Sequence, residues 1–418
     1  MPITVANRMF MSSGLTKAAR YGAVLWVALL FGAGFTVNAT PDVETTAAAT
    51  SRSGQIQTTV LEYTEVPYSF INWGCRVVVR STPFPKEPAF GSGNIIRGDL
   101  QFGDSASNSI AFAWSPAAGK LYLDLNHNLD LTDDAAGVFV CPAKGSQTFS
   151  GIRLPVKTVA GDRETLMDLN LYHYGSRSGC TAAVHSFWQG RVMLQGVECQ
   201  VGVVENPFSR SGLAPDGYLL LRRWAARSEP FSTDNGSFVA FPFPRKLLFQ
   251  NQACRLDCTN ELSGNNARLK LQFTTEQPAL GELKINGHFI ERAILPGGPY
   301  LVVLDQPETV VKVPVGKYNR PEVWLKQGDT VAYRPTYAVR PDQWIAIDGN
   351  KPGVLTAGGP LTNSVSISRQ GKSLRFDYQL LGAGGEVYQL ARVDRSQPPE
   401  FAVYRGDRKI ASGKFEFG

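Results

Sequence analysis

Residues that often carry enzyme chemistry are scarce in this chain of 418 residues, which has four histidines, six cysteines and five methionines. No two histidines stand four residues apart, and the chain has no His-Glu-x-x-His, Gly-x-Ser-x-Gly or phosphate-binding glycine motif. Such histidine pairs hold catalytic zinc, and the glycine motifs position a nucleophilic serine or a phosphate. Zinc hydrolases, serine hydrolases and nucleotide-dependent enzymes therefore have no positive support in the sequence.

Charge is sparse and nearly balanced, since 19% of the residues are charged and the formal net charge is +6. Lysine and arginine are spread along the chain without forming a block. Recognition of nucleic-acid phosphates needs clustered basic residues. We therefore expect no nucleic-acid partner.

Long apolar stretches are confined to the beginning of the chain. Arg8, Lys17 and Arg20 precede an uncharged apolar run over residues 21–37, which ends in Val37-Asn38-Ala39. A basic start, an apolar run and small residues before a cleavage point are typical of a signal peptide. We expect cleavage after Ala39, which would lower the net charge to +3, and export to the periplasm, the outer surface or the medium.

A retained membrane anchor is the alternative interpretation of residues 1–39. The apolar run is shorter than the roughly 20 residues of a spanning helix, and Gly32 and Gly34 interrupt it. No later stretch is apolar for long enough to cross a bilayer. We therefore favour cleavage and expect no transmembrane segment in the mature chain.

The six cysteines all follow the expected cleavage point, at Cys75, Cys141, Cys180, Cys199, Cys254 and Cys258. An even number of cysteines in an oxidising compartment permits up to three disulfides, but their pairing cannot be read from the sequence. The spacing of Cys254 and Cys258 would allow a small closed loop. Buried thiols are the alternative for any of the six.

The pattern after the leader is that of an all-β protein built from antiparallel β-sandwich modules. Short β-branched or alternating runs are separated by Gly, Pro, Asn and Asp, as expected of strands and turns. Residues 120–125 form one such run. Residues 186–188, 191–194 and 197–204 predict a meander with turns at Gln189-Gly190 and Gln195-Gly196.

The strand pattern divides the chain into five parts. We expect a signal peptide over residues 1–39, a flexible leader over 40–58 and an N-terminal β domain over 59–262. Residues 263–335 resemble the small transthyretin-like or carboxypeptidase-regulatory sandwiches, on the segments Pro296-Gly297-Gly298-Pro299-Tyr300 and Val313-Pro314-Val315-Gly316. Residues 336–418 predict an immunoglobulin-like sandwich.

The segment that follows residues 120–123 resembles an EF-hand or dockerin-type calcium loop. A hard cation takes six to eight oxygens, and loop positions one, three, five, seven and nine supply them. The matching residues, with an acidic residue near the end of the loop, are Asp124, Asn126, Asn128, Asp130, Thr132 and Asp134. The resemblance implies a calcium cofactor bound weakly, with a dissociation constant near the roughly 10⁻⁴ to 10⁻³ M of extracellular modules.

Two positions depart from the calcium-loop pattern. The sixth, normally glycine, is Leu129, and the twelfth, normally a bidentate acidic residue, is Ala135. Asp133 or Asp134 would have to replace the missing ligand. The competing interpretation is that Asp and Asn close Asx turns on a long hairpin loop without any ion. The sequence leaves both interpretations open.

The sequence also contains a candidate nucleophilic cysteine, Cys180. His173 precedes Ser178-Gly179-Cys180-Thr181, which distantly resembles the active-site segment of L,D-transpeptidases, where a thiolate attacks a peptide carbonyl. The arginine that follows the cysteine in that family is absent here. We therefore interpret Cys180 as a buried thiol or a disulfide partner.

Taken together, the chain resembles exported bacterial β-sandwich proteins with a degenerate calcium loop, and this resemblance implies no catalytic activity. We expect a non-enzymatic cell-envelope or secreted protein, with a cell-envelope polymer or another exported protein as partner. The alternative is a secreted hydrolase or carbohydrate-binding protein acting on extracellular polymer. It would need paired carboxylates in a cleft or an exposed aromatic strip. Burial of all four of the following tryptophans would argue against such a strip: Trp188, Trp224, Trp324 and Trp344.

Overall fold

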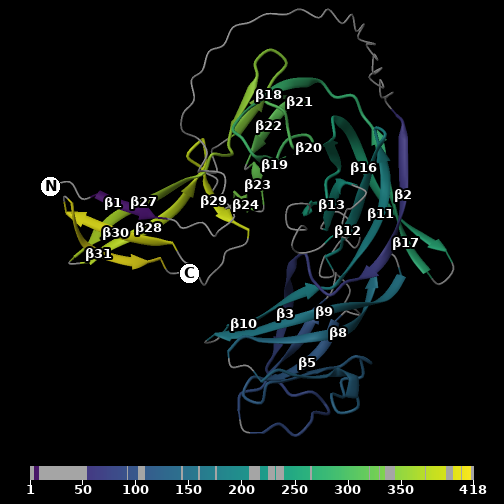
Figure 1. Cartoon of the computed structure of the whole chain (residues 1–418). Helices are drawn as coiled ribbons and strands as arrows, with labels where there is room; N and C mark the ends of the chain where they lie inside the picture. Colours follow the sequence, from purple (N-terminus) through teal and green to yellow (C-terminus); the bar gives the residue numbers. More distant parts are fainter. Residues whose placement is uncertain are drawn as a thin grey trace, which may run out of the picture.

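The structure is a computed structural model of the whole chain, and it is all-β. It describes residues 4–8, 54–91, 93–101, 109–142, 145–158, 161–174, 177–206, 217–224, 231, 240–263, 266–319, 321–328, 330–334, 344–371, 373–391, 399–405 and 407–415. Among these residues there is no α-helix, and the strands form several mostly antiparallel sheets (Figure 1). The predicted fold class is therefore confirmed. The expected cleavage point at Ala39 and the leader up to Ser53 lie outside the described residues.

An eight-stranded antiparallel sheet occupies the lower part of Figure 1, in the order β7-β6-β5-β4-β3-β10-β9-β8. Its strands are β3 (Asn72–Arg80), β4 (Ile96–Gln101), β5 (Ser109–Ser115), β6 (Lys120–Leu123), β7 (Val138–Val140), β8 (Gln147–Thr158), β9 (Gly161–Tyr174) and β10 (Arg177–Val184). A 3₁₀ turn, η2 (Ala135–Gly137), lies between β6 and β7.

A continuous sheet of fifteen strands runs through the rest of the molecule, in the order β14-β13-β12-β11-β2-β17-β16-β15-β20-β19-β23-β24-β29-β28-β27. Its first half consists of β2 (Ile56–Glu65), β11 (Ser186–Leu194), β12 (Val197–Val204), β13 (Tyr218–Arg223), β14 (Ala240–Pro242), β15 (Lys246–Phe249), β16 (Gln252–Ser263) and β17 (Asn266–Thr275). Its second half consists of β19 (Ile290–Leu295), β20 (Leu301–Asp305), β23 (Glu322–Gln327), β24 (Thr330–Tyr333), β27 (Thr362–Gln370), β28 (Ser373–Leu381) and β29 (Val387–Leu390).

Three small sheets complete the described fold. The first contains β18 (Leu280–Asn286), β21 (Val310–Pro314) and β26 (Gly353–Thr356), and the second contains β22 (Gly316–Asn319) and β25 (Trp344–Ile347). The third contains β1 (Thr4–Arg8), β30 (Glu400–Arg405) and β31 (Arg408–Lys414). Thus Thr4–Arg8, which belong to the expected signal peptide, pair with the edge of β30.

The eight-stranded sheet is buried on both faces at β5. Ile110, Phe112 and Trp114 enter core 1, which also receives side chains from β3, β4, β6, β8 to β13 and from Phe231. Ala111 and Ala113, on the opposite face, contact a small cluster with Phe84 and Leu131, with Phe90, Ile95 and Tyr122 at its margin, which we call core 4. Successive strand residues point to opposite faces, so an unbroken apolar run such as 110–114 identifies a strand covered on both sides.

The long sheet likewise separates two cores. Core 2 is enclosed by β2, β11 to β17, β19 and β20, and core 3 lies between β15, β16, β19, β20, β23 and β24 and the small sheets of β18 and β22. On β19, Ile294 enters core 2 while Ala293 and Leu295 enter core 3. Cores 2 and 3 therefore share strands.

One of the two turns predicted in the meander is wrong. Gln195-Gly196 lies between β11 and β12, as predicted, but Gln189-Gly190 lies inside the continuous strand β11. The reason is steric, because a Cβ atom at Gly190 would lie 2.8 Å from Leu61 Cδ2 and 3.1 Å from the Val60 carbonyl oxygen on β2. Glycine is used here for close strand packing and not for a turn.

Hydrogen bonding also crosses the predicted domain boundaries. β17, just beyond the boundary expected at residue 263, pairs with β16 on one side and with β2 on the other. In the C-terminal part, β27 to β29 extend the long sheet. The Phe401 ring on β30 stacks on Phe376 of β28 and also contacts Phe415. The immunoglobulin-like and transthyretin-like assignments remain predictions.

Candidate metal centre

The calcium-like segment forms the loop between β6 and β7, at the edge of the eight-stranded sheet. The Asp124 N–H donates to the Ala111 carbonyl oxygen at 2.9 Å, which fixes the start of the loop against β5. Leu131 is 2% exposed and packs in core 4. The loop is therefore tied to the sheet at its start and by its middle.

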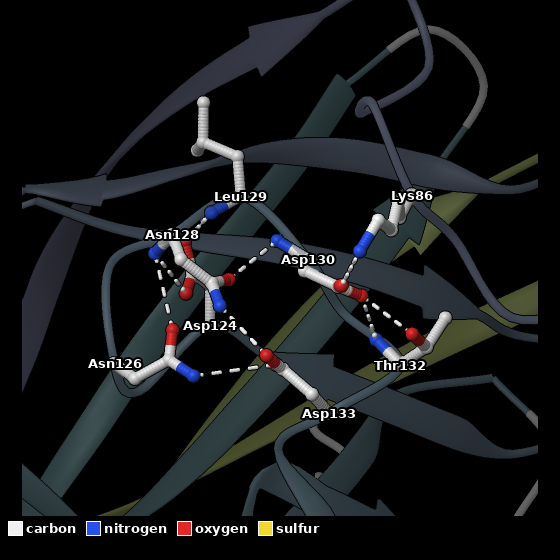
Figure 2. A network of polar contacts seen from close by, with 8 residues as sticks. All are labelled: Lys86, Asp124, Asn126, Asn128, Leu129, Asp130, Thr132 and Asp133. Carbon is white, nitrogen blue, oxygen red and sulfur yellow. Dashed lines mark hydrogen bonds and ion pairs between the residues drawn. The ribbon is translucent and has the colours of Figure 1, made fainter.

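Asp124 is the best-buried acidic group of the loop, with 1% of its surface exposed. Its Oδ1 accepts the Asn128 N–H at 3.1 Å and its Oδ2 accepts the Leu129 N–H at 2.9 Å (Figure 2). Each carboxylate oxygen has two lone pairs. One hydrogen bond per oxygen thus leaves a lone pair on each for a further donor or a cation.

The two asparagines close consecutive Asx turns. Asn126 Oδ1 accepts the Asn128 N–H at 3.1 Å, and Asn128 Oδ1 accepts the Asp130 N–H at 2.7 Å. These bonds are the ones that the ion-free interpretation predicts. The shared Asn128 N–H donor also brings Asp124 Oδ1 and Asn126 Oδ1, at loop positions one and three, close to each other, and calcium loops use oxygens at these positions.

Asp133 lies opposite these residues and faces them across the loop. Its carboxylate accepts the Asn126 Nδ2 donor at 3.2 Å and the Asn128 Nδ2 donor at 2.7 Å. Figure 2 shows Asp124, Asn126, Asn128 and Asp133 pointing toward one another. Asp133, at loop position ten, is thus placed to supply the acidic ligand that Ala135 cannot provide.

Asp130 has a different role from the other acidic residues. Its side chain points away from Asp124 and the two asparagines. It accepts hydrogen bonds from Lys86 Nζ at 2.7 Å and from the Thr132 N–H at 3.0 Å. The hydrogen bond from Lys86, followed by those from Thr132, lowers the pKa of Asp130 to about 2. With its carboxylate engaged outside, Asp130 could contribute only its backbone carbonyl to a cation, as position seven does in calcium loops. Thr132 lies on this same outer side.

Two loop residues adopt the left-handed conformation that favours glycine. His127 and Leu129 both have φ of 62°. Leu129 stands at position six, so the chain makes the sharp turn of a calcium loop without its glycine. A bulky residue in this conformation costs about 1 kcal/mol or more.

The negative charges of the loop affect one another. The pKa of Asp134 is raised above its ordinary value, first by burial and then by the charges of Asp133 and Asp124, although the Leu125 N–H donates to it at 3.1 Å. The pKa of Asp99 on β4 is also raised, mainly by burial and further by Asp124. Like charges that raise a pKa indicate a position where a cation would be stabilised.

The predicted ligands are therefore divided by the structure. Asp124, Asn126 and Asn128 converge, Asp130 and Thr132 turn outward, and Asp134 bonds the backbone near the start of the loop. Asp133 faces the convergent group. Over the described ranges, no three or more His, Cys, Asp and Glu side chains are grouped as a metal site, so any cation here depends on amide and carbonyl oxygens as well.

The structure gives no support to a catalytic Cys180. Cys180 is 2% exposed in core 1, and its strand partner on β9 is Leu171. His173 Nδ1 lies 2.9 Å from Ser178 Oγ, its own partner across the two strands. A thiol nucleophile needs an exposed position beside its base.

The four tryptophans that could form a carbohydrate-binding strip are not all buried. Trp188 and Trp324 are buried at 1% and 8% exposure, whereas Trp224 is half-buried with Arg191 stacked over its ring at 3.9 Å. Trp344 on β25 is 51% exposed. Its partner across β22 is Asn319, so these two strands do not form an aromatic strip at that point.

Comparison with known proteins identifies no relative. No family model, no curated protein and no solved structure matches this chain. The described part of the chain also contains no helix with the length and apolarity of a membrane span.

Proposed function

We propose that the protein is an exported, non-enzymatic β-modular protein of the cell envelope or the secreted fraction, whose first module is stabilised by calcium at the loop of residues 124–134. The observation that carries the calcium part is the convergence of Asp124, Asn126, Asn128 and Asp133, with Asp124 almost completely buried. Export is supported by the basic and apolar character of residues 1–39.

The donor set fits a hard cation. Carboxylate oxygens of Asp124 and Asp133, amide oxygens of Asn126 and Asn128 and the backbone carbonyl of Asp130 are all of the kind that calcium prefers. When bound, calcium would neutralise the facing carboxylates and cross-link the two sides of the loop. Because only the folded chain assembles these oxygens, binding would add to the free energy of unfolding.

The expected size of the effect follows from a weak site. At about 10 mM calcium, roughly 10 to 100 times a dissociation constant of 10⁻³ to 10⁻⁴ M, binding stabilises the fold by about 1.4 to 2.7 kcal/mol. Thermal melting of the purified protein after EDTA treatment, with calcium and with magnesium, measures this. We expect calcium to raise the melting temperature by several degrees, and magnesium to do so less.

Two matched variants make the test specific. Asp124→Asn removes the buried charge from the loop and should abolish the calcium shift. Asp348→Asn is the control, because Asp348 also closes a turn, accepting the Asn350 N–H at 2.8 Å, but lies outside the loop. A protein whose melting temperature is the same in EDTA and calcium would refute the calcium proposal and leave Asx turns as the explanation of the loop.

Carbohydrate binding is the second candidate, and the exposed Trp344 favours it. An indole on the surface can stack on a sugar ring, since one of its faces remains free for apolar contact. Sedimentation with insoluble cellulose, chitin or peptidoglycan, comparing the protein with Trp344→Ala, tests this. Equal amounts of both proteins in the pellet would exclude a role for Trp344.

A further inference from the structure

Two of the six cysteines are direct partners across a pair of strands. Cys75 on β3 stands opposite Cys180 on β10 in the antiparallel register. Opposed residues in such a pair have Cα atoms about 4.5 or 5.5 Å apart. Both distances fall within the roughly 4.4 to 6.8 Å that a disulfide bond spans.

The two thiols also lie on the same face of the sheet. Cys180 is a member of core 1, and Cys75 packs against the same core. The pKa of the Cys75 thiol is raised, first by burial and then by hydrogen bonding with the Cys180 thiol. This second cause requires the two sulfur atoms to be neighbours.

The other four cysteines lack such a partner. Cys199 stands opposite Val192 and Arg223, and Cys254 stands opposite Leu247 and Thr275. Cys258 stands opposite Leu271 on β17.

A small disulfide-closed loop between Cys254 and Cys258 is incompatible with the fold. Both residues lie on β16, four positions apart, which in a strand separates their Cα atoms by about 13 Å. Cys141, after β7, bonds through its backbone to Gly119.

We propose that Cys75 and Cys180 form a disulfide bond when the protein enters an oxidising compartment. The two thiols lose two protons and two electrons as the S–S bond forms. A protein or small-molecule disulfide accepts the electrons and is reduced to two thiols. The oxidising setting rests on the proposed export, whereas the pairing rests on the strand register and on the position of both thiols at core 1.

The disulfide would covalently link β3 and β10, two adjacent strands in the interior of the eight-stranded sheet. Strands β4 to β7, which carry the calcium-like loop, lie on the β3 side of this link, and β9 and β8 lie on the β10 side. About one hundred residues separate the two cysteines, and closing a long loop restricts the unfolded chain most. The disulfide should therefore stabilise the module that holds the loop.

Accessibility predicts when the bond forms. Cys180 is buried and Cys75 is only partly exposed, so an external disulfide would have to react first with Cys75. Burial also disfavours the thiolate that performs this attack. We therefore expect slow oxidation of the folded, reduced protein and fast oxidation during refolding.

The test is to refold the full chain with oxidised glutathione and map its peptides without reduction. We expect a cross-linked peptide pair containing Cys75 and Cys180, and two fewer titratable thiols in denaturant than in the reduced protein. Reduction should lower the melting temperature by roughly 5 to 15 °C. Absence of the cross-link after refolding, or a different pairing, would overturn the proposal.

Cysteine variants test the Cys75–Cys180 pairing, and the location of the protein in its cells tests the proposed export. Cys75→Ser and Cys180→Ala should each abolish the cross-link. Alanine is used at position 180 because it keeps this buried core position apolar, where serine could prevent folding. Cys258→Ser, at another partly buried cysteine, should retain it. A protein that is reduced and cytoplasmic in its cells but cross-links on refolding would refute export and leave the pairing intact.

Discussion

Leu247 and Leu248 are neighbours on β15, yet their side chains are buried in two different cores. Leu247 is 0% exposed in core 2, and Leu248 is 2% exposed in core 3. Alternation along one strand thus makes β15 part of both cores. The same holds for β16, where Ala253 enters core 3 and Cys254 enters core 2.

Truncating either leucine should therefore lower the free energy of unfolding substantially. We expect Leu247→Ala and Leu248→Ala each to lower the free energy of unfolding by about 2 to 5 kcal/mol, because each leaves a cavity in a packed core. Leu280→Ala, at a position that is 46% exposed, is the control and should cost much less. Urea unfolding followed by circular dichroism measures all three. A Leu247→Ala protein as stable as the control would contradict the shared-core arrangement.

The calcium-like loop offers a stabilising substitution. Leu129 has φ of 62° and is 36% exposed, so its side chain contributes little packing while its backbone is strained. Leu129→Gly should raise the free energy of unfolding by about 0.5 to 1 kcal/mol, because glycine adopts this conformation without steric cost.

Leu280→Gly, at the first residue of β18 opposite Pro314 of β21, should lower the free energy of unfolding instead, because glycine weakens a strand. Thermal melting of both variants measures the difference, and equal destabilisation would show that Leu129 is not strained.

Much of the fold could be predicted from the sequence, for a physical reason. The unbroken apolar run of residues 110–114 and the valine-rich residues 197–204 are both strands with buried side chains, as such patterns predict. The turn predicted at Gly190 is wrong because glycine occurs both in turns and at close strand contacts, and only the distance to Leu61 distinguishes the two. Pairing between distant strands, such as β2 with β17, has no local signal in one sequence.

The candidate site was predictable in part. The positions of Asp124, Asn126 and Asn128 follow from the loop pattern, and the structure brings them together. Lys86 could not be found from the sequence, because it lies 44 residues from Asp130, the residue that it pairs with. The inward orientation of Asp133, rather than Asp134, is likewise set by side-chain contacts with the two asparagines.

The pair of Lys86 and Asp130 predicts a response to acid. The pKa of Asp130 is lowered to about 2 in the folded protein, below the roughly 3.9 of an unfolded chain. A lowered carboxyl pKa contributes stability that is present above pH 4 and is lost as the pH falls through 2. Lys86→Met should raise the pKa of Asp130 toward its ordinary value. Carboxyl NMR titration of both proteins measures this, and an unchanged Asp130 pKa in the variant would show that Thr132 alone lowers it.

The buried ion pair on the core 2 side of β19 and β20 should stabilise the protein more than surface ion pairs do. Arg292 on β19 contacts Asp305 on β20 at 2.5 and 2.8 Å, and their side chains are 3% and 16% exposed. Asp305→Ala should lower the free energy of unfolding by about 3 to 5 kcal/mol, because it leaves a buried guanidinium without its carboxylate.

The matched control for that pair is Glu282→Ala. Glu282 contacts Lys312 at 2.9 Å between exposed side chains, and its loss should cost about 0 to 1 kcal/mol. Chemical unfolding of the two variants in parallel gives both values. Similar small losses would show that the buried pair is replaced by water after truncation.

The first 39 residues should be dispensable for the three large cores. β1 pairs with β30 in the described structure, whereas the buried residues of cores 1, 2 and 3 all lie at or beyond Leu61. Removing residues 1–39 should therefore leave the main thermal transition of the protein unchanged, and should free only the edge of β30. Melting and hydrogen exchange of the full and shortened chains test this. Loss of the main transition in the shortened chain would mean that residues 1–39 belong to the fold and would contradict their removal as a signal peptide.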